Sequence, residues 1–185
     1  MKHYWDRVEI GDRLPELLVD HITRLQSIRF AAATSDFSPF YFDEDSAAKA
    51  GYQSILVPHT VAVCLLEEAL HTHATNSNLN DLRITFLRLI WPKDSLTTKG
   101  VVLRRYIHHG DHRIDIRVWV ENQLGEVVLK GYALVTLFKN EDHEKREKTS
   151  SPKPSKENLK ELCARALELA KKQPRTSKKI VSELA

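Results

Sequence analysis

The stretch at residues 55–66, ILVPHTVAVCLL, is apolar on nearly every side if it is wound as a helix. A helix that is apolar all round belongs inside a protein, because none of its faces suits water. Pro58 fits the position just before the first turn, so His59 or Thr60 then lies at an N-terminus with free backbone N–H groups. We therefore expect a buried helix that continues to about His73.

After this helix and a polar loop at residues 76–80, the pattern changes to the two-residue period of β-strands. A first strand is expected from residue 82. Three further strands, rich in β-branched and aromatic residues, are expected at residues 96–107, 113–121 and 127–138. Strands this close in sequence form an antiparallel meander. Together with an edge strand near Pro15, they predict a single α+β domain whose antiparallel sheet wraps round the long helix.

A polar loop at residues 34–43, TSDFSPFYFD, follows a shorter helix that Thr23 caps. The loop carries the carboxylate of Asp36 and the phenol of Tyr41, and Pro39 stiffens it by barring Ser38 from helical geometry. A polar loop against the mouth of a buried helix predicts a ligand site. Asp36 has a second interpretation as a residue that caps a turn, and Tyr41 has one as a packing residue.

Charge divides the chain into two parts. Residues 1–138 hold 15 Lys and Arg against 17 Asp and Glu, whereas residues 139–185 hold 13 against 8. Because the positive charge lies in this last part, here named the basic tail, no nucleic-acid partner is expected for the main body. The basic tail is predicted to be a charged, partly disordered linker followed by an amphipathic helix at residues 159–170.

No apolar run is long enough to cross a membrane and no signal layout opens the chain, so we expect a cytoplasmic protein without a transmembrane segment. Cys64 and Cys163 are expected to be free thiols. Two groups of histidines do not match the spacing of a closed zinc site and are interpreted as solvated polar turns. These are His71 with His73, and His108 and His109 with His112. We expect neither a metal nor a cofactor.

Several segments together resemble a known family. They are DFSPFY at residues 36–41, Gly51-Tyr52, VPHT at residues 57–60, and the turn from Arg88 to Asp94. In spacing and residue type they are similar to MaoC-like domains, which are hot-dog-fold proteins of the (R)-specific enoyl-CoA hydratase and 3-hydroxyacyl-thioester dehydratase group. The resemblance covers residues 5–138 and implies a lyase-type protein of fatty acid metabolism that binds acyl-CoA or acyl-carrier protein.

Active members of that family carry the pattern D-x-N-P-x-H, whose Asp and His hold the water that is added to the enoyl double bond. The resemblance places Asp36 at the Asp, Ser38 at the Asn, Pro39 at the Pro and Tyr41 at the His. It places His59 at the glycine of the helix entry. By the same resemblance, Ser38, Pro39, Thr60 and Arg88 are expected to contact substrate. Arg88 is also expected to pair on the sheet surface, with a phosphate of CoA or carrier protein as the alternative.

A phenol with an ordinary pKa near 10 is a poor replacement for an imidazole as a base at neutral pH. The chain is therefore similar to the substrate-binding, His-lacking subunits or halves of the family, whose partner chain supplies the Asp and the His. The resemblance implies a homo- or heterodimer with another hot-dog chain. Two alternatives remain open. One is an active homodimeric hydratase that uses Asp36 with Tyr41 or His59, and the other is a non-enzymatic acyl or lipid scaffold that uses the basic tail for a protein partner.

Overall fold

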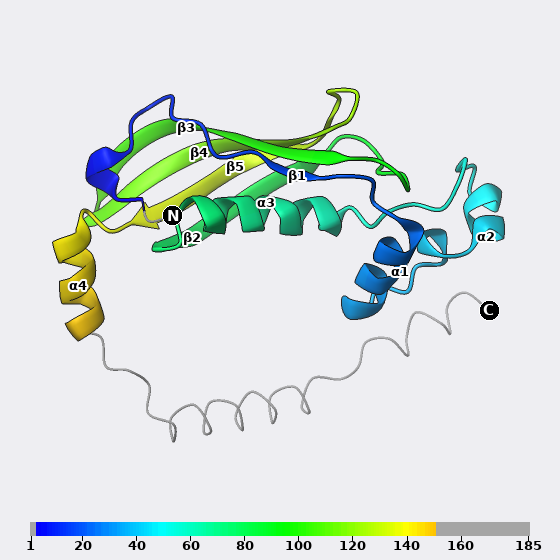
Figure 1. The fold of residues 1–185 in the computed structure, drawn as a ribbon, viewed down its shortest axis with the longest axis horizontal. Helices are drawn as coiled ribbons and strands as arrows, with labels where there is room; N and C mark the ends of the chain where they lie inside the picture. Colours follow the sequence, from blue (N-terminus) through cyan, green and yellow to red (C-terminus); the bar gives the residue numbers. More distant parts are fainter. Residues whose placement is uncertain (1–2, 151–185) are drawn as a thin grey trace, which may run out of the picture. The chain divides into compact units, whose positions relative to one another are not determined.

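A computed structural model describes residues 3–150 and contains one five-stranded antiparallel sheet, in the order β1-β3-β4-β5-β2. Short helical segments lie between its first strand and one long helix, and that long helix lies along one face of the sheet (Figure 1). In chain order the elements are η1 (Trp5–Arg7), β1 (Leu17–Val19), α1 (Arg24–Ala33), η2 (Pro39–Tyr41), α2 (Glu44–Lys49), α3 (Thr60–His73), β2 (Ser77–Phe86), β3 (Leu96–His108), β4 (Asp111–Asn122), β5 (Val127–Leu137) and α4 (Glu141–Ser150).

The three long strands β3, β4 and β5 form the predicted meander, with their ends within a few residues of the predicted ones. β2 does not continue that meander, because it pairs with the free side of β5 and so becomes an edge strand. The loop predicted at residues 76–80 is wrong, since β2 begins at Ser77. β2 tolerates the asparagines of this segment because an edge strand is open to solvent. One of them, Asn80, also accepts a hydrogen bond through its Oδ1 from the Thr136 hydroxyl at 2.7 Å.

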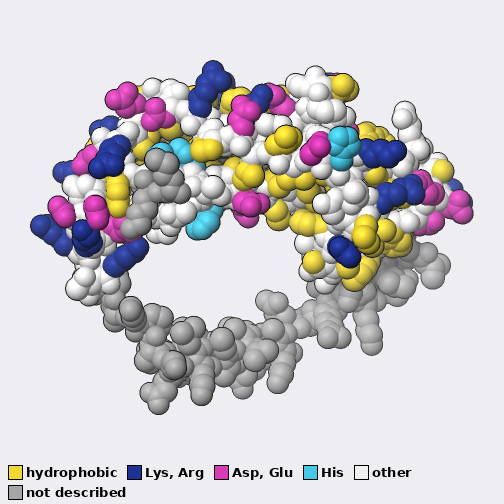
Figure 2. Space-filling model, in the orientation of Figure 1, with side chains coloured by type: hydrophobic (Ala, Val, Ile, Leu, Met, Phe, Trp, Pro, Cys, Tyr) yellow, Lys and Arg dark blue, Asp and Glu magenta, His cyan; other side chains and the backbone are white. Residues whose placement is uncertain are grey.

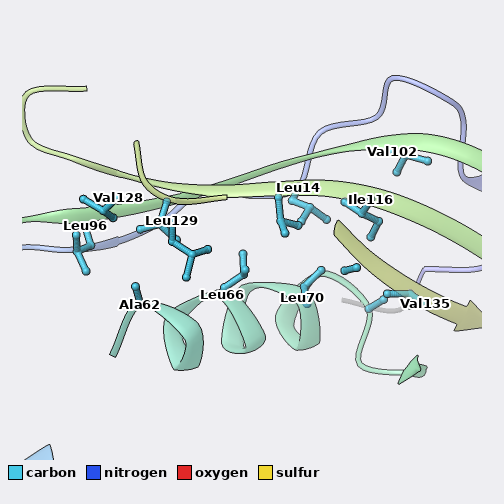
Figure 3. Close-up of a cluster of buried hydrophobic side chains, with 14 of the residues drawn as sticks. Leu14, Ala62, Leu66, Leu70, Leu96, Val102, Ile116, Val128, Leu129 and Val135 are labelled. Carbon is cyan, nitrogen blue, oxygen red and sulfur yellow. The ribbon is translucent and has the colours of Figure 1, made fainter. Parts of the chain in front are cut away.

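The core lies between α3 and the face of the sheet that α3 covers. Ala62, Leu66 and Leu70 point from α3 toward alternate residues of the strands, and Figure 3 shows Leu66 and Leu70 beneath the side chains of the sheet. In β4 these alternate residues, Ile114 to Val120, are buried at every second position. Because successive side chains of a strand point to opposite faces, the residues that face α3 are buried and those on the opposite face of the sheet are more exposed.

Two features of the predicted buried helix need correction. Residues 55–58 are extended rather than helical, because Val57 bridges to Ile90 and its N–H donates to the Ile90 carbonyl at 2.9 Å. The helix itself is not buried on every side in this chain. Cys64 is exposed and Leu65 is only half-buried, because within the described residues the sheet covers only one side of α3.

α4 occupies residues that were predicted to be a disordered linker. Asn140 caps it by accepting the His143 N–H at 2.9 Å, and acidic residues in its first turn suit the helix dipole. Glu144 is 2% exposed and accepts a hydrogen bond from the Tyr4 hydroxyl at 2.8 Å. A buried contact to the N-terminal segment therefore offsets the unfavourable composition. The amphipathic helix predicted at residues 159–170 lies outside the described residues.

Candidate functional site

The predicted site loop starts from a fixed turn at the end of α1. Ser35 has a φ of 57°, and its N–H donates to the Ala32 carbonyl at 3.2 Å. The Asp36 N–H donates to the Ala31 carbonyl at 2.9 Å. This pair of bonds is the Schellman ending of a helix, with serine at the position that usually holds glycine. The turn therefore determines where the exposed Asp36 side chain leaves the helix.

The single turn of η2 places the Tyr41 side chain close to Asp36. Pro39 occupies the first position of that turn, and the Tyr41 N–H donates to the Ser38 carbonyl at 3.1 Å. Burial raises the pKa of the Tyr41 phenol, and the negative charge of Asp36 and a hydrogen bond to it raise this pKa further. The phenol therefore keeps its proton at neutral pH and donates its hydrogen bond to the Asp36 carboxylate, and it ionises less readily than a free tyrosine.

Hydrogen bonds tie this loop to the segment that leads into α3. The Leu56 N–H donates to the Phe40 carbonyl at 2.8 Å, and the buried Ser27 hydroxyl donates to the Leu56 carbonyl at 3.3 Å. On the other side of the loop, Asp43 caps α2 by accepting the Asp45 N–H at 3.3 Å. Asp43 also accepts from Ser46, chiefly from its hydroxyl, and this lowers the pKa of the Asp43 carboxyl. Asp43 is thus committed to capping and is not part of the ligand site.

His59 and Thr60 stand at the entry to α3, as the sequence predicted. The His59 side chain makes no capping bond, and its ring packs against Phe86 at the end of β2 with 5.0 Å between centroids. In the described part of the chain, no hydrogen bond or ring contact joins His59 to Asp36 or Tyr41. The structure therefore brings Asp36 and Tyr41 together, but it does not bring His59 to them.

Arg88 follows the end of β2 and lies on the sheet surface, where its guanidinium is 3.3 Å from the Glu126 carboxylate. Surface pairing is thus the arrangement seen. Ser38 immediately precedes η2 without a side-chain capping bond, and Pro39 and Thr60 are exposed. These side chains lie in the loop or at the helix entry, within reach of solvent.

The two histidine groups are not simply solvated turns. His73 is buried, stacks on His3 at 4.1 Å between centroids, and has its pKa lowered to about 4 by burial. His112 is half-buried against Trp5, whereas His108 and His109 are exposed in their hairpin. The interpretation as solvated turns is therefore wrong for His73 and His112, because the N-terminal segment covers them. Within residues 3–150, no cluster of three His, Cys, Asp or Glu side chains is arranged to hold a metal.

Two further aromatic residues, Tyr52 and Phe86, border the site. Tyr52 acts electrostatically on Tyr41 and packs its ring edge against Phe40 at 5.7 Å between centroids. Phe86 is the residue on which the His59 ring rests. Tyr52 belongs to the Gly51-Tyr52 pair that carries part of the family resemblance, and Gly51 ends α2 with a φ of 86°. Nothing in the local sequence pattern marks Phe86, because its contact to His59 joins segments far apart in the chain.

Comparison with solved structures identifies the architecture. The R-hydratase PhaJ1 from Pseudomonas aeruginosa superposes with a TM-score of 0.66 at 21% identity, over 74% of this chain and 86% of that one. A MaoC-like dehydratase from Rhodospirillum rubrum gives 0.67 at 19%, over 75% and 98%. The HadBC (3R-hydroxyacyl-ACP dehydratase) complex from Mycobacterium tuberculosis gives 0.59 at 21%, over 71% and 98%. The chain has the hot-dog fold, and the α+β architecture expected from its sequence is confirmed.

The sequence itself defines the family. The sequence model of the FAS1-like dehydratase domain region matches residues 9–131, which is well over half of the chain. The chain therefore belongs to the FAS1-like dehydratase family, and its MaoC-like resemblance is confirmed. No curated protein matches it significantly in sequence. Within residues 3–150, no helix has the length and apolar character needed to cross a membrane.

Proposed function

We propose that this chain is an acyl-thioester-binding member of the hydratase/dehydratase family whose own catalytic pair is incomplete, and that it acts with a second hot-dog chain. The observation that supports this most directly is the pairing of Asp36 with Tyr41. The family's histidine position holds a phenol whose pKa is raised and whose hydroxyl interacts with the carboxylate. In this proposal the partner chain supplies the Asp and the His.

Hydration of an enoyl thioester needs a group that takes a proton from water and another that gives one to the α-carbon. A phenol with a raised pKa holds its proton at neutral pH, so Tyr41 cannot take a proton from water. Asp36 alone is a carboxylate that can accept a hydrogen bond from substrate. The pair is suited to holding an oxygen-bearing acyl chain and not to activating water.

The entry to α3 suits the thioester carbonyl. The N–H groups of Val61 and Ala62 already donate to the carbonyls of Pro58 and His59, both at 3.0 Å. The Thr60 N–H, at the positive end of the helix dipole, is left as the donor for a ligand oxygen. Ser38 and Pro39 line the loop beside it in this proposal. Arg88, which Glu126 holds on the sheet surface, is assigned to the phosphate of CoA or of a carrier protein, and no cofactor is needed.

A partner chain is supported by the apolar surface around the site. Hydrophobic side chains gather where the short helices lie beyond the N-terminal end of α3 (Figure 2). The exposed members of this surface are Leu25, Ile28, Phe37 and Phe42 from α1 and the loop, with Phe86 and Leu87 from the end of β2. A concentration of exposed apolar side chains of this kind marks an interface. We assign it to a second hot-dog chain, of the same or of another sequence.

The active-homodimer alternative receives less support from the geometry. It requires His59 or Tyr41 to act as the missing base, yet the His59 ring packs on Phe86 and the Tyr41 hydroxyl interacts with Asp36. The scaffold alternative depends on the basic tail, most of which lies outside the described residues. The HadBC structure supports the two-chain version by analogy, since the dehydratase in it is a complex.

The test separates binding from turnover. We expect crotonyl-CoA to bind the purified chain in a calorimetric titration, and Asp36→Asn to weaken that binding by about tenfold through loss of a charged hydrogen-bond acceptor. Asp45→Asn, which removes an exposed carboxylate of α2, is the matched control and should bind as the unaltered chain does. If the protein is folded and binds no acyl thioester, the proposal is contradicted.

A further inference from the structure

The face of the sheet opposite α3 carries an ordered array of cations and aromatic rings. The register places Arg83 of β2, Tyr132 of β5 and Arg117 of β4 directly side by side. Lys130 and Trp119 are likewise paired in the neighbouring row of β5 and β4. Neighbouring strands lie about 4.8 Å apart, so each ring is flanked by positive charge at close range. No described helix covers this face, since α3 lies along the other one (Figure 1).

The array lies along a connected groove. One hollow of about 640 Å³ and a second of about 330 Å³ share Arg83 and Tyr132 in their walls. The second hollow and a third of about 250 Å³ share Arg117 and Lys130. The shared walls show that the three hollows adjoin one another across β3, β4, β5 and β2. A groove of this length fits a segment of another macromolecule better than it fits a small molecule.

Most charges on this face are already paired, but two cations are not. Arg83 pairs with Asp81 at 2.8 Å and Arg104 with Asp115 at 2.5 Å. Within the described residues, Arg117 and Lys130 have no acidic partner. The Arg117 guanidinium lies 5.5 Å from the centre of the Trp119 ring, which orients it without neutralising it. The middle of the groove therefore keeps two uncompensated positive charges.

We propose that this groove docks an acidic segment of a separate protein. Arg, Tyr and Trp are the residues that contribute most to binding at protein interfaces, and the walls of the groove supply all three. Tyr132, 58% exposed, offers the apolar contact, while Arg117 and Lys130 select carboxylates. If a second copy of the chain docked through the same groove, the Arg117 and Lys130 cations of the two copies would face and repel one another. The basic tail, with 13 Lys and Arg against 8 Asp and Glu, is repelled for the same reason.

The test uses the full chain and a fluorescein-labelled helical peptide that carries glutamates along one face and leucines beside them, with fluorescence anisotropy as the readout. We expect the glutamate peptide to bind and its glutamine counterpart to bind at least tenfold more weakly. The double variant Arg117→Gln/Lys130→Gln should lose at least tenfold in affinity, and Tyr132→Ala about tenfold. The control is the double variant Arg29→Gln/Lys49→Gln, which removes one arginine and one lysine from α1 and α2, outside the groove. It should bind the peptide as the unaltered chain does.

Three results would overturn the proposal. Equal affinity for the glutamate and glutamine peptides, or binding of neither, would show that the groove does not select acidic protein. Unchanged affinity of Arg117→Gln/Lys130→Gln would place binding elsewhere, most simply on the basic tail. Tighter binding of a twelve-nucleotide oligouridylate than of the glutamate peptide, lost in Tyr132→Ala, would assign the face to single-stranded nucleic acid.

Discussion

The sheet with α3 and the segment that carries the site are held together by different forces. In the first region, apolar side chains from α3 and from alternate strand positions are buried together, and backbone ladders span the whole sheet. In the second region, residues 24–54, the buried side chains of the helices are only Ser27, Ala31 and Ala47, and caps and turns fix the chain locally. The fold is thus determined by the core, whereas the site depends on local turn chemistry.

The same contrast explains the exposed aromatic residues. Phe37 is 66% exposed and Phe42 is 47% exposed, although the loop that holds them is well fixed by hydrogen bonds. Burial of such rings contributes stability only where something covers them. The first region therefore has its core within this chain, and we expect the second to be completed by a partner.

The largest effect is expected in the first region. Leu66 is fully buried between α3 and the sheet, so Leu66→Ala should reduce the free energy of unfolding by about 2–5 kcal/mol. Leu65, which is only half-buried at the margin of the same core, is the matched control, and Leu65→Ala should cost less. Chemical denaturation of both variants measures the difference. Equal losses would mean that the core does not centre on the face of α3 that carries Leu66.

A pH dependence is expected from the same region. The pKa of His73 is lowered from 6.5 to about 4 in the folded protein, mainly by burial. The unfolded chain therefore takes up a proton as the pH falls from about 6.5 toward 4, while the folded protein does not, and stability decreases over that window. His73→Phe should give a flatter profile of unfolding free energy against pH. His71→Phe, at an exposed position, should leave the profile unchanged.

A smaller effect is expected in the second region. Asp43→Ala removes the cap of α2 and should cost about 1 kcal/mol. Because α2 is held by local bonds, we expect this loss to show as faster amide exchange in α2 while the amides of β4 keep their protection. Asp45→Ala removes a carboxylate that makes no capping bond and serves as the control. If β4 lost protection equally, the two regions would not be separate.

The smallest expected change is a gain. Ser35 has a φ of 57°, a conformation that costs a residue with a side chain about 1 kcal/mol. Ser35→Gly should therefore stabilise the protein by about 0.5 kcal/mol after the greater flexibility of the unfolded chain is subtracted. Ser35→Ala cannot relieve the strain and should give no gain. Thermal unfolding of both variants distinguishes them, and equal melting temperatures would contradict the strain argument.

The sequence predicted the first region better than the second. The ends of β3, β4 and β5 were found to within a few residues because their patterns repeat over long segments. The position of β2 beside β5 was missed, because pairing between strands distant in sequence leaves no local trace. The exposed side of α3 was missed for a related reason, since hydropathy does not say whether the covering surface belongs to the same chain.

In the site, residue types were predicted and contacts were not. The approach of Tyr41 to Asp36 follows from the stiff turn at Pro39, which the sequence shows. The separation of His59 from that pair depends on Phe86, which arrives from another element and carries no motif. The capping role of Asp43 depends on local sequence, because an acidic residue favours a helix start, whereas the burial of His73 depends on the distant N-terminal segment.

Hydration of crotonyl-CoA by the purified chain, followed as loss of the enoyl-thioester absorbance with Asp36→Asn alongside, tests the central claim most directly. An incomplete catalytic pair predicts that crotonyl-CoA binds to the folded protein and is not hydrated faster than in buffer, with or without the substitution. Hydration that is fast in the unaltered chain and vanishes in Asp36→Asn would contradict this account, because it would show that Asp36 works here with a base of the chain's own.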